Sequence, residues 1–199
     1  MMMWLALACA RTRVEGAIAG EVPPVSSSMF YVEEAPEGDR ITVLLSSEPN
    51  ACRLYEYYLA VYADSPTWRG HSIAWQKAFP ATFWELTATI VVEDSALPVE
   101  DLAVGAVAWN ASPEAGQSTG SIVHFLDHPD PNDPAVTGYA VGWSTDGGEV
   151  RVDRYDGLDR FVGEFTTVAV DPEDGTPRGD LTMFFDATIC PNIAAFGLP

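Results

Sequence analysis

The chain has 199 residues, of which 47% are hydrophobic, so it can form one domain with a full-sized core and does not resemble a disordered segment. Its 29 acidic residues outnumber its 10 basic residues and give a formal net charge of −19 at pH 7. A surface this negative repels nucleic-acid phosphates and anionic lipid headgroups. We therefore expect no nucleic-acid partner and no charge-driven binding to membranes.

The N-terminal segment is typical of a shortened lipoprotein signal. An apolar run of eight residues leads into Ala6-Leu7-Ala8-Cys9, with small residues where signal cleavage requires them. The run is short and no basic residue precedes it, so Cys9 is either a lipidation site or a free cysteine. We expect lipidation, with residues 1–9 as a truncated signal, residues 10–28 as a flexible tether, and a location at the bacterial cell envelope or outside the cell.

A single domain is expected over residues 29–199, beginning with strands at residues 29–32 and 41–46. One short helix, at about residues 48–62, is predicted by apolar residues that recur every three or four positions. Ser47 is the expected N-cap of this helix, and Cys52 lies on its apolar stripe.

Beyond residue 80 the pattern is that of strands separated by Gly, Pro and Asp turns. Asp146-Gly147-Gly148 is a hairpin signal between two of these strands. We expect a mainly β fold, a single antiparallel β-sandwich or barrel of about eight or nine strands, with the choice between the two left open. The predicted strands are residues 82–92, 102–109, 120–126, 135–143, 149–155, 160–170 and 179–187.

The three cysteines fit one lipid-modified residue and one disulfide, Cys52–Cys190, across 138 positions. This bond would tie the helix to the last strand and would indicate export. The alternative is a pair of buried free thiols in a cytosolic protein.

Four segments carry a resemblance to a known group of proteins: residues 119–123, 161–165 and 185–190, and residues 45–52 before the expected helix. They resemble the strand and cysteine motifs of secreted or lipid-anchored β-rich proteins of Gram-negative, myxobacteria-like bacteria. The resemblance implies the topology, the disulfide and the envelope location, and it assigns no catalytic residue. The chain departs from the pattern in its short signal and in an aromatic insert at residues 68–84.

Trp68, Trp75 and Trp84 lie in or beside the segment 65–82, which we interpret as a loop, and define an aromatic insert at residues 65–84. Exposed aromatic rings stack on sugars and other flat ligands, so these three side chains are a candidate platform for a glycan or small molecule. Large aromatic residues more often pack in a core, which is the competing interpretation.

Two acidic turns are candidate calcium sites because clustered carboxylates at turns suit that ion. Aspartate beside Pro or Gly is equally typical of ordinary turns, and neither turn has the spacing of an EF-hand. The first turn contains Asp127, Asp130 and Asp133, and the second contains Asp171 and Asp174.

No residues in the sequence identify a catalytic site. Residues 116–120 match G-x-S-x-G, but they lead into a strand, whereas the nucleophile elbow leads into a helix. His124 and His128 lack the placement of a zinc site because their segment runs from a strand into a loop. The primary hypothesis is thus a non-enzymatic, envelope-associated domain with a structural or surface-interaction role, its partner an envelope protein or glycan.

Two other functions stay open. One is a glycan- or small-ligand-binding module that uses residues 65–84, with or without calcium. The other is an acidic hydrolase, which would require a concave site where carboxylates or histidines with shifted pKa values converge.

Overall fold

The computed structural model describes residues 12–33, 39–92, 102–136, 138–155 and 159–191. Cys9 and the rest of the expected signal segment lie outside these residues. Within them the chain forms nine strands and two helices, and neither helix is long and apolar enough to cross a membrane. In chain order the elements are β1 (Arg13–Gly16), β2 (Ser27–Glu33), β3 (Asp39–Ser46), α1 (Ala51–Ala63), α2 (Trp68–Ala78), β4 (Phe83–Val92), β5 (Leu102–Gly105), β6 (Gln117–Asp127), β7 (Tyr139–Tyr155), β8 (Arg160–Val170) and β9 (Pro177–Ile189).

The strand pairing closes on itself, which confirms the mainly β fold and favours the barrel-like architecture over the sandwich. The sequence of neighbours is β2, β3, β4, β6, β7, β8 and β9, all antiparallel. A short parallel pairing between β9 and β2 completes the ring. The two remaining strands are additions, since β1 pairs with β9 and β5 pairs with β7.

The interior of this closed sheet holds the larger hydrophobic core. Along β4, Leu86, Ala88 and Ile90 point inward and are at most 1% exposed. The adjacent positions Glu85 and Thr87 therefore lie on the outer face, because successive side chains of a strand point to opposite sides. This alternation decides which residues can meet the helices.

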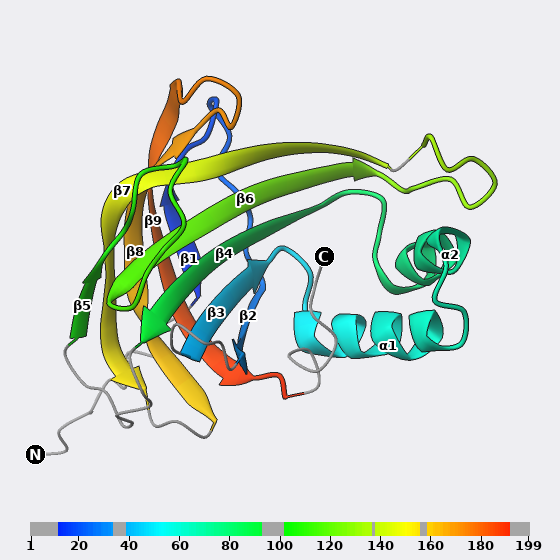
Figure 1. Ribbon diagram of the computed structural model, residues 1–199, viewed down its shortest axis with the longest axis horizontal. Coiled ribbons are helices and arrows are strands. Elements are labelled where there is room, and N and C mark those ends of the chain that lie inside the picture. Colours follow the sequence, from blue (N-terminus) through cyan, green and yellow to red (C-terminus); the bar gives the residue numbers. More distant parts are fainter. Residues whose placement is uncertain (1–11, 34–38, 93–101, 137, 156–158, 192–199) are drawn as a thin grey trace, which may run out of the picture.

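The two helices pack against each other outside the closed sheet, beside the ends of β4 and β6 (Figure 1). Their apolar side chains form a second hydrophobic core with the outer faces of β2, β3 and β4. Tyr55 and Tyr58 of α1, Ala74 of α2 and Phe83 of β4 are each at most 3% exposed in this layer. The fold thus has two cores, one inside the sheet and one between the sheet and the helices.

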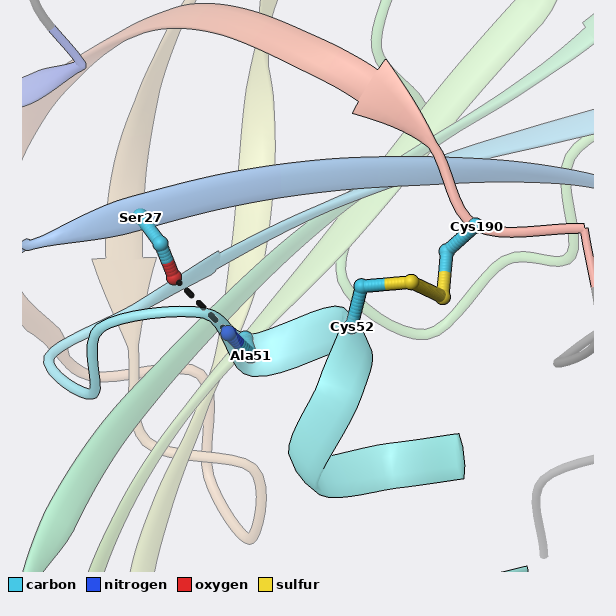
Figure 2. Close-up of a disulfide and its surroundings, with 4 residues drawn as sticks. All are labelled: Ser27, Ala51, Cys52 and Cys190. Atoms are coloured by element: carbon cyan, nitrogen blue, oxygen red, sulfur yellow. Dashed lines mark hydrogen bonds between the residues drawn. A yellow bond between two sulfur atoms is a disulfide. The ribbon is translucent and has the colours of Figure 1, made fainter. Parts of the chain in front are cut away.

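The Cys52–Cys190 disulfide is present and joins the first turn of α1 to the residue after β9 (Figure 2). The two Cα atoms lie 5.6 Å apart, within the usual range for a disulfide. Beside it, the Ser27 hydroxyl accepts a hydrogen bond from the Ala51 amide at 3.3 Å and donates one to the Glu48 carbonyl at 2.6 Å. The start of α1 is therefore fixed to both β9 and β2.

The predicted helix begins three residues later than expected, and Ser47 is not its N-cap. Asn50 occupies that position with a left-handed backbone (φ 61°) and no side-chain capping bond. The Ser47 hydroxyl instead accepts a hydrogen bond from the Trp84 amide at 2.9 Å. The cap prediction is wrong because β4 uses this hydroxyl.

Three further expectations need correction. Residues 65–82 are not a loop, since Trp68–Ala78 form α2 with the Thr67 hydroxyl accepting a hydrogen bond from the Gly70 amide. Asp146-Gly147-Gly148 does not turn the chain, since β7 continues through it with a bulge. Residues 13–28 are not a tether, because β1 pairs with β9 and Ile18 is 1% exposed in the core.

Candidate functional site

A pocket of about 540 Å³ lies between the helical layer and the outer face of the sheet. It has the size of typical small-molecule sites, which are roughly 300–1,000 Å³. Its walls come from both helices, from three strands and from the β6–β7 connection, which in Figure 1 reaches past α2. The lining residues are Tyr55, His71, Trp75, Glu85, Ser121, Val123, Phe125, Asp127, Pro129, Gly138, Tyr139 and Ala140.

The floor of the pocket follows from strand register. Glu85 of β4 pairs with Val123 of β6, and Val123 pairs with Gly142 of β7. Ser121 and Phe125 share the face of Val123 because they are two residues away on the same strand. The pleat therefore exposes one carboxyl in a floor that is otherwise apolar or weakly polar.

The roof is α2, which presents His71 and Trp75 one helical turn apart. Contacts with the β6–β7 connection hold this helix in place. The Gln76 side-chain amide donates to the Pro129 carbonyl at 2.7 Å, and the His128 imidazole donates from Nε2 to the Phe79 carbonyl at 2.9 Å. These two bonds fix the distance between the roof and one wall.

Glu85 is the chemically distinctive residue of the pocket. Its side chain is partly buried, and burial raises its pKa from 4.5 to about 7, while a hydrogen bond from the Tyr55 hydroxyl opposes the rise. Burial, together with the nearby Glu85 charge, raises the pKa of Tyr55 well above 10. Tyr55 therefore stays protonated and donates a hydrogen bond to the Glu85 carboxyl, which itself gains or loses a proton near neutral pH.

His71 is the second titratable residue that faces the pocket from the helices. Its Nδ1 shares a hydrogen bond of 2.7 Å with the Tyr58 hydroxyl. Burial lowers the pKa of His71 below its usual 6.5, so the ring is neutral at pH 7. The roof thus contributes a polar but uncharged group.

Aromatic rings form the remaining walls. The Trp75 ring packs against Phe79 at 4.5 Å and Phe125 at 5.2 Å, measured between ring centroids. Phe83 stacks on Phe125 at 4.4 Å and supports it from β4. Tyr139 is 60% exposed and lines the pocket from the start of β7, where a ligand could cover it.

The three tryptophans proposed as a platform do not share one surface. Trp68 is 48% exposed at the start of α2, and Trp75 lines the pocket. Trp84 is 5% exposed and points into the sheet interior, where its ring is parallel to those of His124 and Trp143, with centroid distances of 4.1 Å and 5.7 Å. The prediction of one platform is wrong because strand alternation turns Trp84 away from the helices, and Trp75 is the one of the three that lines the pocket.

The acidic turns use their carboxylates to stabilise the backbone. Asp127, Asp130 and Asp133 each accept a hydrogen bond from a backbone amide one or two residues ahead. Asp171 and Asp174 do the same, and Asp171 also pairs with Arg178 at 2.7 Å. Calcium binding at these turns stays a prediction, which calorimetric titration with millimolar calcium would test.

One group of potential metal ligands occurs among the described residues, formed by Cys52, Glu56 and Cys190. Both sulfur atoms belong to the disulfide, so they do not offer the thiolates that bind metals. These three residues therefore form or adjoin the disulfide between α1 and the end of β9 and do not form a metal site.

The pocket residues that matter most, Glu85, Tyr55 and His71, were missed by the sequence reasoning. One signal was available, a lone glutamate inside the apolar strand pattern of residues 82–92. Its meaning depends on the helices that cover the outer face of β4, and the second of these was taken for a loop.

Comparison of the chain with protein-family models, with curated proteins and with solved structures finds no match.

Proposed function

We propose that this protein is an exported domain that binds a small ligand in the pocket between α2 and the outer face of β4, β6 and β7. The observation that carries the proposal is the pocket itself, which combines a volume of about 540 Å³, aromatic walls and one partly buried carboxyl. Ligand sites have this composition, an apolar surface with a few polar groups that fix orientation.

Export is supported by the Cys52–Cys190 disulfide, because such bonds persist in oxidising compartments and are rare in the cytosol. Lipidation at Cys9 would hold the domain at the envelope, with the pocket open to solutes or glycans there. A structural envelope protein would share the disulfide and the anchor but would have no use for a carboxyl with a raised pKa in a pocket.

The acidic hydrolase is the second candidate, favoured by the same carboxyl, since Glu85 has the raised pKa that a general acid needs. Glycoside hydrolysis uses two carboxyl groups on either side of the bond. Asp127, the other acid in the lining, lies four residues beyond Val123, the strand partner of Glu85. At roughly 3.3 Å per residue this separation is about 13 Å along the strand, which favours binding over paired-carboxylate catalysis.

Filling the pocket tests the proposal. Ala140 lines the pocket from β7 and is exposed, so Ala140→Trp adds bulk there without entering either core. Ala103, an exposed residue of β5 away from the pocket, provides the matched control Ala103→Trp. A panel of small aromatic and sugar-like fragments would be screened against all three proteins by ligand-observed NMR.

We expect fragments that bind the natural chain to bind Ala103→Trp equally and to lose binding to Ala140→Trp by about tenfold or more. In protein-observed spectra of the natural chain, the chemical-shift changes caused by a bound fragment should centre on Trp75 and Phe125. Fragments that bind Ala140→Trp as well as the natural chain, or a panel without any binder, would overturn the pocket as a ligand site.

A further inference from the structure

The charges that line the pocket limit what it can bind. Its ionisable side chains are the acids Glu85 and Asp127, the neutral His71, and two tyrosines. Within the described lining there is no lysine or arginine. The whole chain carries a formal net charge of −19, so the field at the pocket favours cations and opposes anions.

The walls suit the same kind of ligand. Trp75, Phe125 and Tyr139 place aromatic rings around the volume that Glu85 faces. Aromatic ring faces attract ammonium groups, by about 0.5–1 kcal/mol at exposed sites and about 2 kcal/mol where water is excluded. A carboxylate at the floor and rings on the sides together form the surroundings of a bound organic ammonium.

We propose that the pocket binds an organic ammonium ion, with the charged nitrogen at Glu85 and the hydrocarbon body between Trp75, Phe125 and Tyr139. This inference rests on the proposed function and names its ligand class. The Tyr55 hydroxyl occupies one carboxylate oxygen, Oε2, by hydrogen bonding and leaves Oε1 for the ligand. An acidic pocket of this kind repels ligands that carry a carboxylate or phosphate, and it binds an ammonium ion more tightly than a neutral sugar.

Because Glu85 ionises, the binding of an ammonium ion should depend on pH. The ionisable groups that interact with this carboxyl are Tyr55 of α1 and Tyr31 of β2. His71 of α2, Tyr139 and the more distant Asp127 line the other walls of the pocket. An ammonium ion needs the carboxylate form, so binding below the pKa of Glu85, about 7, must release a proton and must tighten as pH rises. A neutral ligand that accepts a hydrogen bond from protonated Glu85 would show the opposite trend.

A matched pair of probes separates the two cases: 2-phenylethylammonium and 2-phenylethanol, which differ in the charged group. Calorimetry at about pH 6.5, in phosphate and in MES, measures both affinity and proton release because the buffers differ in ionisation enthalpy. The proteins are the natural chain, Glu85→Gln, Ala140→Trp and Ala103→Trp. Circular dichroism of each variant verifies that it is folded.

We expect the ammonium probe to bind the natural chain about tenfold more tightly than the alcohol, with proton release. Glu85→Gln should lose about tenfold for the ammonium and little for the alcohol, and it should abolish the proton release. Equal affinities for the two probes, or an ammonium affinity unchanged in Glu85→Gln, would overturn the cation assignment.

The two proposals fail in different ways. If the alcohol binds, and Ala140→Trp removes that binding while Ala103→Trp does not, the pocket stands and the ammonium assignment falls. Absence of binding by both probes up to about 10 mM would overturn the ammonium assignment, and the fragment panel then decides the pocket independently.

Discussion

Glu85 links the chemistry of the pocket to the stability of the protein. Its pKa is about 7 in the folded protein and 4.5 when unperturbed, so the folded state holds the proton more tightly than the unfolded state does. Between these two values the folded state binds more protons, and the free energy of unfolding therefore falls as pH rises. The loss begins near pH 4.5 and is complete above about pH 7.

Replacing Glu85 by Gln should remove this loss. The amide stays neutral and still accepts the Tyr55 hydrogen bond, so the variant should match the natural chain below pH 4.5 and exceed it above pH 7. One pKa unit corresponds to about 1.4 kcal/mol, so the gain is up to about 3 kcal/mol. Urea unfolding measured across this pH range gives the difference directly.

Glu149→Gln on the exposed part of β7 is the matched control, since it also removes one carboxylate from a strand. Its comparison with the natural chain corrects for the change in net charge. A stability difference between Glu85→Gln and the natural chain that stays constant with pH would contradict the assigned ionisation.

At the scale of elements, β7 depends on glycine to bend. The strand has 17 residues and pairs first with β6 and then with β5, and its pairing with β8 shifts register between Asp146 and Glu149. Gly148 has φ 97°, and a Cβ atom there would lie 1.9 Å from the Thr166 carbonyl oxygen on β8. Both the backbone angle and the close approach require glycine.

Gly148→Ala should therefore lower the free energy of unfolding by about 2 kcal/mol or more, because the strained backbone and the displaced β8 act together. Gly105→Ala on β5 is the control, since its added Cβ meets nothing within 4 Å. We expect that control to stay within about 0.5 kcal/mol of the natural chain in urea unfolding. Equal effects of the two substitutions would show that the bulge tolerates a side chain.

Some elements could be predicted from the sequence and others could not. Residues 160–170 were predicted as a strand and form β8 with the same bounds, because alternating apolar residues report local pleating directly. The Asp-Gly-Gly signal was wrong because glycine with positive φ serves a bulge as well as a hairpin turn. Local residue types do not distinguish a bulge from a hairpin turn, because the outcome depends on how the neighbouring strand pairs with this segment.

The missed helix explains the missed site. Gly70 near the start of α2 and the low apolar content of its sequence, WRGHSIAWQKA, hid the helical period. A Cβ at Gly70 would lie 1.7 Å from the Ser65 carbonyl oxygen, so the turn that leads into α2 requires glycine at a position where glycine usually argues against a helix. Without α2, nothing covers the lone Glu85 on the outer face of β4, so the pocket could not be predicted from the sequence.

In the whole molecule, one covalent bond joins the helical layer to the end of the closed sheet, within the second hydrophobic core. Cys52 lies at the start of the helical layer, and Cys190 follows β9, which completes the closed sheet. The chain between them runs through every strand from β4 to β9 and contains all of the residues that line the pocket. The pairing was predicted from three cysteines, since only two of them lay inside the expected domain.

Removing this bond should lower the stability of the whole fold. Opening a loop with a sequence separation of 138 costs about 4–5 kcal/mol in the chain-entropy model, because the unfolded chain regains its freedom. We expect Cys52→Ala/Cys190→Ala to lose this amount in urea unfolding under oxidising conditions. The reduced natural chain supplies the control, since it lacks the bond but keeps both sulfur atoms, and it should unfold close to the double variant. If the oxidised natural chain and the double variant unfolded at the same urea concentration, the bond would not constrain the unfolded chain as the model requires.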